Sequence, residues 1–345
     1  MRIGILTAGG DCPGLNAAIR GVGKTAIVEH GMEVYGISSG FLGLIESEYR
    51  EITENDLSGI LTMGGTILGT SREKPFKKGT YNDYIRSKPE IIKETYRTMN
   101  LDSLVCIGGN GTMKTASKLA DEGLNVVGVP KTIDNDVWGT DETFGFDSAL
   151  SIATEAIDRI HTTANSHKRV MVIEVMGHHA GWLSLYAGIA GGGDVILIPE
   201  IPFNEEYVAE YLTERSNAGK PYSIVVVAEG IEQPKKKKKK KSAGRYIAKR
   251  LQELTDLSTR ETILGYIQRG GTPTARDRIL ATRLGAYAAN MAAKGEYGKM
   301  AALKDGEMSG VALSEVAGKL KLVPEDDPMV RKARAIGTCF GDERM

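Results

Sequence analysis

Short apolar runs rich in β-branched residues recur along the chain and predict β-strands. They cover residues 3–7, 34–37, 104–107, 126–129, 170–175, 195–198 and 224–227. Most segments between these runs carry apolar residues at helical spacing, and the first of them predicts a helix over residues 15–28. Strands that alternate with helices are typical of parallel sheets, because a parallel connection must cross over the sheet. The pattern therefore predicts an α/β protein.

The size and composition of the chain favour a two-lobed globular enzyme. Its 345 residues are enough for two α/β lobes, each with its own buried core. With 41% hydrophobic and 26% charged residues, the composition argues against a disordered or fibrous protein. The 44 basic and 44 acidic residues balance, so no overall field directs the chain to nucleic acid or to an anionic membrane. Any anion site must therefore be local.

The cysteines and the apolar segments indicate a cytoplasmic protein. Cys12, Cys106 and Cys339 are few, odd in number and far apart, which suits a reducing compartment better than a disulfide framework. The N-terminus lacks the apolar core and the cleavage site of a signal peptide. The most apolar later region, residues 180–199, is interrupted by a glycine triplet and Asp194, so we do not expect it to span a membrane.

Seven consecutive lysines occupy residues 235–241, between Pro234 and a helical pattern. Like charges in a row repel one another and cannot pack, so the run predicts a solvated loop or a connection between lobes. The alternative is a segment that binds a polyanion, which the neutral total charge disfavours.

Glycine-rich turns follow two of the predicted strands and precede predicted helices. The first reads GGDCPG over residues 9–14, and the second reads IGGNGT over residues 107–112. Glycines allow backbone N–H groups to approach phosphate oxygens, and a helix N-terminus adds positive potential. The first turn matches neither the dinucleotide fingerprint nor the P-loop, and alone it fits a tight strand-to-helix turn equally well. Two such turns favour a shared phosphate site, because ligands bind beyond the carboxyl ends of parallel strands.

Two aspartates follow the predicted strand 126–129, in the segment PKTIDND over residues 130–136. In an extended segment, residues two apart point the same way, so we expect Asp134 and Asp136 to face one site. Beside phosphate-binding turns, one carboxylate can take a hydroxyl proton while the other helps to hold Mg²⁺. The alternative is that both acids cap turns, which the neighbouring Lys131 and Thr132 disfavour.

Several arginines are candidate ligands of a sugar phosphate, because a planar guanidinium binds phosphate through paired hydrogen bonds. They are Arg72 after a glycine-rich stretch, Arg169 at the start of a strand, and Arg260 and Arg269 on either side of a predicted strand over residues 261–267. Taken singly, each is more typical of a protein surface. Glu229, after the predicted strand 224–228, can accept hydrogen bonds from sugar hydroxyls. His178 and His179 lack a partner at ligand spacing, so we predict no zinc site.

Together these segments resemble the phosphofructokinase family over nearly the full length of the chain. The matching segments follow the order of the family and are GGDCPGLNAAIRG at 9–21, GFLGL at 40–44, GGTILGTSR at 64–72, IGGNGT at 107–112, PKTIDND at 130–136, EVMG at 174–177, AEG at 228–230 and LGYIQRGGTP at 264–273.

The resemblance implies two Rossmann-like lobes with the active site in the cleft between them, usually in a homodimer or homotetramer. Residues 1–145 plus about 268–318 would form the larger phosphate-donor lobe, and residues from about 146 to 267 plus 319–345 the smaller fructose 6-phosphate lobe. The implied reaction is that of 6-phosphofructokinase, which transfers a phosphoryl group to the C1 hydroxyl of fructose 6-phosphate in glycolysis. Mg²⁺ is the implied cofactor, and ATP or pyrophosphate is the donor.

The resemblance also assigns roles to individual positions. Donor contacts fall on Gly10, Arg72, Asn110, Gly111, Thr112 and Lys131. Asp134 matches the base that takes the C1 proton, Thr132 and Arg72 complete the catalytic set, and Asn110 and Asp136 match metal ligands. Sugar contacts fall on Thr132, Asp134, Asp136, Met176, Gly177, Glu229, Tyr266 and Arg269, and Arg169 and Arg260 match arginines that reach the 6-phosphate from a neighbouring subunit.

The chain departs from most members of the family at several of these positions. Asn110 replaces an acid, and an amide keeps an oxygen ligand for Mg²⁺ but loses its charge. Tyr266, His178, Phe41 and Lys131 differ from the well-studied allosteric bacterial enzymes and place the chain nearer a branch that mixes ATP and pyrophosphate users. Lys131 favours pyrophosphate, whereas Gly111 leaves room for the α-phosphate of a nucleotide. We expect ATP as the donor.

Two rival functions are weaker. The NAD-kinase group shares a Gly-Gly-acid-Gly-Thr turn, but it does not account for the TIDND and GYIQRGG segments. A non-catalytic sugar-phosphate sensor is suggested by Asn110. The presence of Asp134, Thr132 and Arg72 argues against that sensor.

Overall fold

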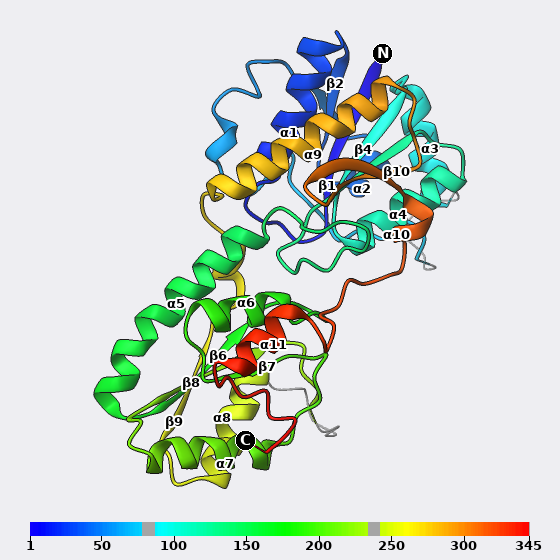
Figure 1. Cartoon of the computed structure of the whole chain (residues 1–345). Coiled ribbons are helices and arrows are strands. Elements are labelled where there is room, and N and C mark those ends of the chain that lie inside the picture. Colours follow the sequence, from blue (N-terminus) through cyan, green and yellow to red (C-terminus); the bar gives the residue numbers. More distant parts are fainter. Residues whose placement is uncertain (78–86, 234–241, 345) are drawn as a thin grey trace. The chain divides into compact units, whose positions relative to one another are not determined.

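The computed structural model describes residues 1–77, 87–233 and 242–344 (Figure 1). These residues form two compact units, each built from two stretches of chain. The first unit consists of Met1–Ser148 and Arg269–Lys321, and the second of Ala149–Gln268 and Leu322–Met345. The lysine run at 235–241, predicted as a loop or a lobe connection, lies outside the described residues.

The first unit is built on a seven-stranded sheet with the order β11-β10-β5-β4-β1-β2-β3. Its strands are β1 (Arg2–Ala8), β2 (Glu33–Ile37), β3 (Tyr49–Glu51), β4 (Ser103–Gly108), β5 (Val126–Pro130), β10 (Lys299–Lys304) and β11 (Glu307–Ala312). The central strands β10, β5, β4, β1 and β2 run parallel, and the edge strands β3 and β11 pair antiparallel.

Helices cover both faces of this sheet, which explains why its inner strands β1, β4 and β5 read as nearly continuous apolar runs. The helices are α1 (Leu15–Lys24), α2 (Phe41–Glu46), α3 (Lys88–Thr98), α4 (Asn110–Asp121), α9 (Ala275–Ala293), α10 (Leu313–Val316) and the first turn of α5 (Phe146–His167). One face packs against α2, α3, α4 and α10. On the other face α9 contacts β4, β5 and β10 and lies against α1. A β-carbon at Gly285 would lie 2.5 Å from the Ala18 carbonyl, so glycine permits this close helix contact.

The second unit contains a four-stranded parallel sheet with the order β7-β8-β6-β9. Its strands are β6 (Val170–Val175), β7 (Val195–Leu197), β8 (Ser223–Ala228) and β9 (Thr259–Ile263), and its helices are the rest of α5, α6 (Trp182–Ala190), α7 (Glu205–Asn217), α8 (Ala243–Leu254) and α11 (Pro328–Ala335). Val172, Val225 and Val227 are fully buried in the core beneath Leu212 and Leu251. The prediction of an α/β fold with parallel sheets is confirmed in both units.

The predicted strand over residues 261–267 is correct only as far as Ile263. Strand β9 ends at Ile263, and Gly265–Arg269 form a 3₁₀-helix. Gly265 has a φ of 53°, a left-handed conformation that ends the extended backbone. As a result Arg260 lies within β9, and Tyr266 lies in the 3₁₀-helix.

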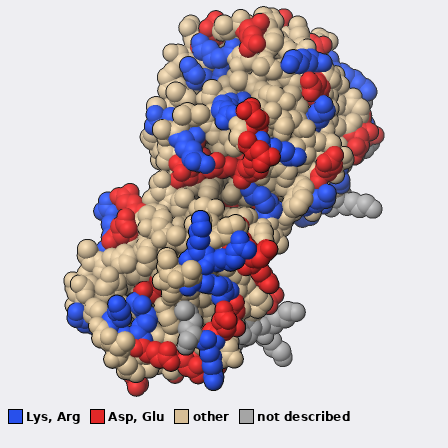
Figure 2. Space-filling view, in the orientation of Figure 1, with Lys and Arg blue, Asp and Glu red and all other residues tan. Residues whose placement is uncertain are grey.

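Charges of both signs share one face of the protein, in keeping with the balanced composition. Figure 2 shows Lys and Arg interspersed with Asp and Glu over the face that it presents. No helix among the described residues is long and apolar enough to cross a membrane.

Candidate active site

The first glycine turn, residues 9–14, connects β1 to α1 and lies against two cationic side chains. Arg269 donates from Nη1 to the Asp11 carbonyl at 3.0 Å, and a β-carbon at Gly10 would lie 2.7 Å from the same nitrogen. The Lys131 ammonium donates to the Gly10 carbonyl. Burial lowers the pKa of Lys131, and the positive charge of Arg269 lowers it further. The turn therefore brings a lysine and an arginine to one end of the sheet, where they can bind an anion.

Arg72 follows a segment that is tied to the same turn. The backbone N–H of Gly9 donates to the Ser71 carbonyl at 2.9 Å, and the Thr70 hydroxyl donates to the Gly9 carbonyl at 2.8 Å. Arg72 itself is exposed. These bonds place Arg72 directly after a residue that touches the first glycine turn.

The second glycine turn connects β4 to α4 and lies beside the first. Strands β1 and β4 are neighbours, with Ala8 paired to Gly108, and the buried Thr112 hydroxyl donates to the Ala8 carbonyl at 3.4 Å. Gly108 also accepts a hydrogen bond from the backbone N–H of Lys131 at 2.9 Å. A β-carbon at Gly111 would meet no atom within 4 Å. Both turns and the start of the aspartate loop thus meet at the carboxyl ends of β1, β4 and β5, as we expected.

The loop that carries the two aspartates (residues 131–136) turns instead of running extended. Asn135 has a φ of 51°, so the assumption of an extended segment, from which we expected the two acids to face one way, is wrong. Asp134 and Asp136 are nevertheless both buried and lie within electrostatic reach of each other. Burial, and then the charge of Asp134, raise the pKa of Asp136 to about 7. The Thr132 hydroxyl accepts a hydrogen bond from the Asp134 N–H at 3.1 Å.

Asn110, the predicted metal ligand on α4, reaches this loop. Its Nδ2 donates to the Asp136 carbonyl at 3.3 Å. Its Oδ1 is buried and accepts no hydrogen bond within the part of the chain that the structure describes. Hard cations such as Mg²⁺ prefer oxygen ligands and are often bound by only one or two carboxylates together with substrate phosphates. A buried amide oxygen next to Asp136 fits such an ion.

In the second unit, Glu229 holds the loop after β6. Its Oε1 accepts hydrogen bonds from the backbone N–H groups of Gly177 at 3.3 Å and His178 at 2.9 Å. Gly177 has a φ of 152°, and a β-carbon there would lie 2.4 Å from the Ala180 carbonyl. The structure therefore brings together Met176, Gly177 and Glu229, three of the predicted sugar ligands.

Arg169 and Arg260 do not join this group within one chain. Arg169 precedes β6 and Arg260 is the second residue of β9, at the ends of these strands where the chain enters the sheet. Glu229 and Gly177 lie beyond the opposite ends. The six residues of β6 span about 20 Å. Tyr266 is 75% exposed. Among the described residues, no hydrogen bond joins it to Glu229 or to the loop after β6.

A family model described as Phosphofructokinase matches residues 2–292. The chain belongs to the phosphofructokinase family. An ATP-dependent 6-phosphofructokinase 3 from Bacteroides thetaiotaomicron is 60% identical over 99% of this chain and 100% of the relative. An ATP-dependent 6-phosphofructokinase from Spirochaeta thermophila is 59% identical over 98% of this chain and 97% of the relative. A pyrophosphate–fructose 6-phosphate 1-phosphotransferase from Amycolatopsis methanolica is 46% identical over 94% and 97%.

Solved structures of the phosphofructokinase family share the fold. Phosphofructokinase from Pichia pastoris in the T-state is 33% identical with a TM-score of 0.81, and the match covers 91% of this chain but 35% of that longer chain. A pyrophosphate-dependent phosphofructokinase from Nitrosospira multiformis superposes with a TM-score of 0.84 at 23% identity, over 99% of this chain and 92% of that chain. The latter similarity supports the fold alone.

Two residues that were not predicted from the sequence, Thr143 and Lys321, hold the aspartate loop of this phosphofructokinase family member. Thr143 donates from its hydroxyl to the Thr132 carbonyl at 2.8 Å and from its N–H to Asn135 Oδ1 at 3.1 Å. Lys321 also reaches Asn135, at 2.9 Å. The available signal was Asn135 itself, since asparagine is one of the few residues that tolerate a left-handed backbone.

Proposed function

We propose that this chain is an ATP-dependent 6-phosphofructokinase. It transfers the terminal phosphoryl group of ATP to the C1 hydroxyl of fructose 6-phosphate, which yields fructose 1,6-bisphosphate, ADP and a proton. The observation that carries the proposal is the meeting of two glycine turns and a buried aspartate pair at the carboxyl ends of three neighbouring parallel strands. That arrangement supports phosphate binding next to a base, the two needs of phosphoryl transfer to a hydroxyl.

Asp134 is the proposed base. Its carboxylate takes the proton of the C1 hydroxyl as that oxygen attacks the terminal phosphorus. The hydrogen bond from its backbone N–H to the Thr132 hydroxyl, at 3.1 Å, supports a fixed position for this loop. A base held in place gains from effective concentration, because it does not need to be brought to the substrate in each turnover.

The donor phosphates are proposed to bind at the two glycine turns. Lys131 and Arg72 supply positive charge there, Gly10 and Gly111 supply backbone N–H groups, and Thr112 lies beside them in the second turn. Lys131 is buried, so its ammonium interacts with an anion in a medium of low dielectric, where charge pairing is strong. Asn110 and Asp136 would hold Mg²⁺, which when bound neutralises charge on the phosphate oxygens.

Fructose 6-phosphate is proposed to bind Met176, Gly177, Glu229, Tyr266 and Arg269. Arg169 and Arg260 would reach its 6-phosphate from a neighbouring subunit in a homodimer or homotetramer. The distance that β6 puts between Arg169 and Glu229 in one chain supports this division, since no single sugar phosphate spans about 20 Å. On this proposal the enzyme works in the cytoplasm.

ATP is the proposed donor on two grounds. Two relatives, 60% and 59% identical to this chain, are named as ATP-dependent 6-phosphofructokinases. The space around Gly111 is open, with no atom within 4 Å of a β-carbon there. Lys131 and the pyrophosphate-using relative of 46% identity keep pyrophosphate as the second candidate.

The deciding experiment measures turnover of the purified chain with fructose 6-phosphate, Mg²⁺ and either ATP or pyrophosphate. We expect a higher kcat/KM with ATP and the formation of equal amounts of fructose 1,6-bisphosphate and ADP. A higher kcat/KM with pyrophosphate would make the chain a pyrophosphate-dependent phosphotransferase. Binding of fructose 6-phosphate without turnover with either donor would instead indicate a sensor.

A further inference from the structure

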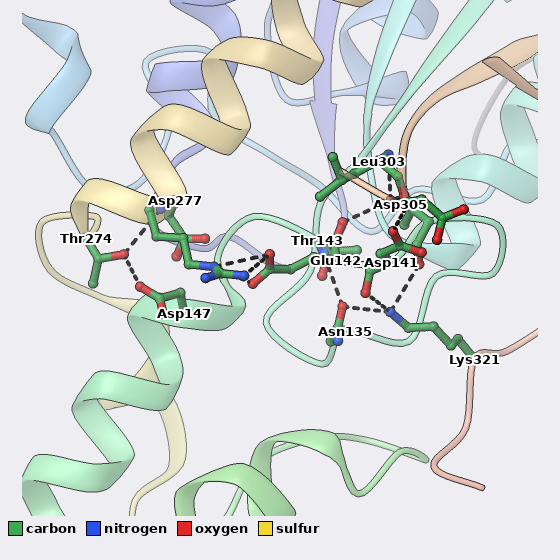
Figure 3. A network of polar contacts seen from close by, with 12 residues as sticks. Asn135, Asp141, Glu142, Thr143, Asp147, Thr274, Asp277, Leu303, Asp305 and Lys321 are labelled. Atoms are coloured by element: carbon green, nitrogen blue, oxygen red, sulfur yellow. Dashed lines mark hydrogen bonds and ion pairs between the residues drawn. The ribbon is translucent and has the colours of Figure 1, made fainter. Parts of the chain in front are cut away.

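Lys321 places its ammonium group against the loop that continues from the aspartate pair. Nζ donates to Asn135 Oδ1 at 2.9 Å, to the Thr140 carbonyl at 3.1 Å and to the Asp141 carbonyl at 2.7 Å. Figure 3 shows these contacts converging on the lysine from the loop above it. An ammonium group has three N–H donors, and these three acceptors match that number.

The backbone of Lys321 reaches the same loop. Its N–H donates to the Asp136 carbonyl at 2.9 Å. Leu320, the residue before Lys321, forms an isolated antiparallel bridge with Val137. One short segment of chain therefore holds the loop through both its main chain and a side chain. This segment lies 186 positions after Asn135 in the sequence, so the contact is entirely tertiary.

Asn135 is the residue through which Lys321 can affect the aspartates. It stands between Asp134 and Asp136 in the chain, with a φ of 51°. The backbone angles of a residue set the relative directions of its two neighbours, and a left-handed angle is costly for any residue other than glycine, asparagine or aspartate. Asn135 Oδ1 accepts hydrogen bonds from both Lys321 Nζ at 2.9 Å and the Thr143 N–H at 3.1 Å, which hold that conformation.

We propose that Lys321 is a positioning residue of the phosphoryl-transfer reaction, because it holds Asn135 and thereby fixes the directions of the Asp134 and Asp136 carboxylates. The inference rests on the proposed function for the roles of those two acids. The proposed function assigns no substrate or metal contact to Lys321. Its effect should fall on the transition state, since a displacement of a base by about 1 Å can cost about 100-fold in rate.

The test compares kinetics of Lys321→Met, which keeps the apolar stem and removes the ammonium, with those of the parent. We expect kcat to fall by about 10- to 100-fold, with the KM values for fructose 6-phosphate and ATP within about threefold of the parental ones. The matched control is Lys319→Met. Lys319 is exposed and its ammonium lies 5.7 Å from the centroid of the Trp138 ring, so its loss should leave kcat unchanged.

A second variant separates positioning from general support of the fold. Asn135→Gly tolerates the left-handed backbone but removes the side-chain oxygen that Lys321 and Thr143 hold. It should lower kcat as Lys321→Met does, again with little change in KM. Because both changes break the same contact, the double variant should be no more than about threefold slower than the slower single variant.

The outcomes are distinct. Parental kcat in Lys321→Met, losses that multiply in the double variant, or a loss confined to KM would each overturn the inference. If Lys321→Met fails to fold, as judged by circular dichroism, Asn135→Gly carries the test, and parental kcat in that variant would overturn the inference. A parent chain inactive with either donor would overturn the proposed function and this inference with it, whereas an active parent isolates the role of Lys321.

Discussion

The side-chain amide of Asn110 donates to the backbone carbonyl of Asp136 at 3.3 Å, across the ends of two neighbouring strands. This contact leaves Asn110 Oδ1 buried and without a hydrogen bond among the described residues. The Asn110 side chain also lies next to the carboxyl group of Asp136, whose pKa is raised to about 7, first by burial and then by the charge of Asp134. The proposal therefore assigns two groups to Mg²⁺: the neutral amide oxygen of Asn110 and the carboxyl group of Asp136, whose raised pKa makes it harder to ionise.

The raised pKa of Asp136 predicts that Mg²⁺ competes with a proton. The cation binds the ionised carboxylate, and ionisation becomes more complete as the pH rises through about 7. We therefore expect the free Mg²⁺ concentration for half-maximal rate to fall by about tenfold between about pH 6 and about pH 8. Initial rates at saturating fructose 6-phosphate, with free Mg²⁺ corrected for binding to ATP, measure this concentration.

The control for this pH dependence is Asp136→Asn, which has no proton to lose. That variant should require more Mg²⁺ at every pH, and its requirement should change little over the same range. A pH dependence equally steep in the variant would assign the effect to the nucleotide and contradict the role of Asp136.

Asn110→Asp should lower the Mg²⁺ requirement. The replacement keeps an oxygen at the same position and adds the negative charge that a hard cation prefers. The matched control is Asn125→Asp, since Asn125 also donates from its side-chain amide to a backbone carbonyl, that of Asp102 at 2.8 Å, but is exposed. An unchanged or increased requirement in Asn110→Asp alone would show that residue 110 does not bind the metal.

Asp134→Asn should lower kcat by about 100- to 10,000-fold, the contribution typical of a positioned general base. The amide matches the carboxylate in shape, so the variant should still bind fructose 6-phosphate with an affinity close to that of the parent. Steady-state rates measure the first effect and calorimetric titration with the sugar phosphate measures the second. Asp121→Asn, at the exposed end of α4, serves as the control. Near-parental kcat in Asp134→Asn would exclude Asp134 as the base.

Gly111→Asp should abolish the use of ATP. The open space around Gly111 accepts a side chain without displacing the fold, so the loss would report on repulsion between the new carboxylate and the donor phosphates. Gly111→Asn has the same shape without the charge and should keep more ATP activity. With Lys131 already in place, the aspartate variant is also the one in which to measure a gain in pyrophosphate turnover. Equal ATP kinetics in the parent and Gly111→Asp would place residue 111 away from the donor.

Much of the fold follows from local patterns in the sequence. The inner strands β1, β4 and β5 of the first unit are almost entirely buried, so their residues are mostly apolar and their bounds were predicted within one or two positions. The edge strands β3 and β11, which carry polar and exposed residues, and strand β10 were not predicted. The glycine turns are equally local, because the ends of parallel strands bring Ala8, Gly108 and Pro130 into register wherever the intervening chain goes. The order of long motifs was likewise enough to predict the family.

The same local reasoning failed where side chains or turns are set by remote parts of the chain. Residues 261–267 were predicted as one strand, yet the strand ends at Ile263, and the backbone turns at Gly265 and leaves Tyr266 75% and Ile267 60% exposed. Asp134 and Asp136 meet through a left-handed Asn135 and not through strand alternation. That conformation depends on Thr143 and on Lys321, which is 186 positions away. A hydrogen bond between such distant residues does not show in the residue spacing of either segment, because it forms only once the two stretches of the first unit have packed together.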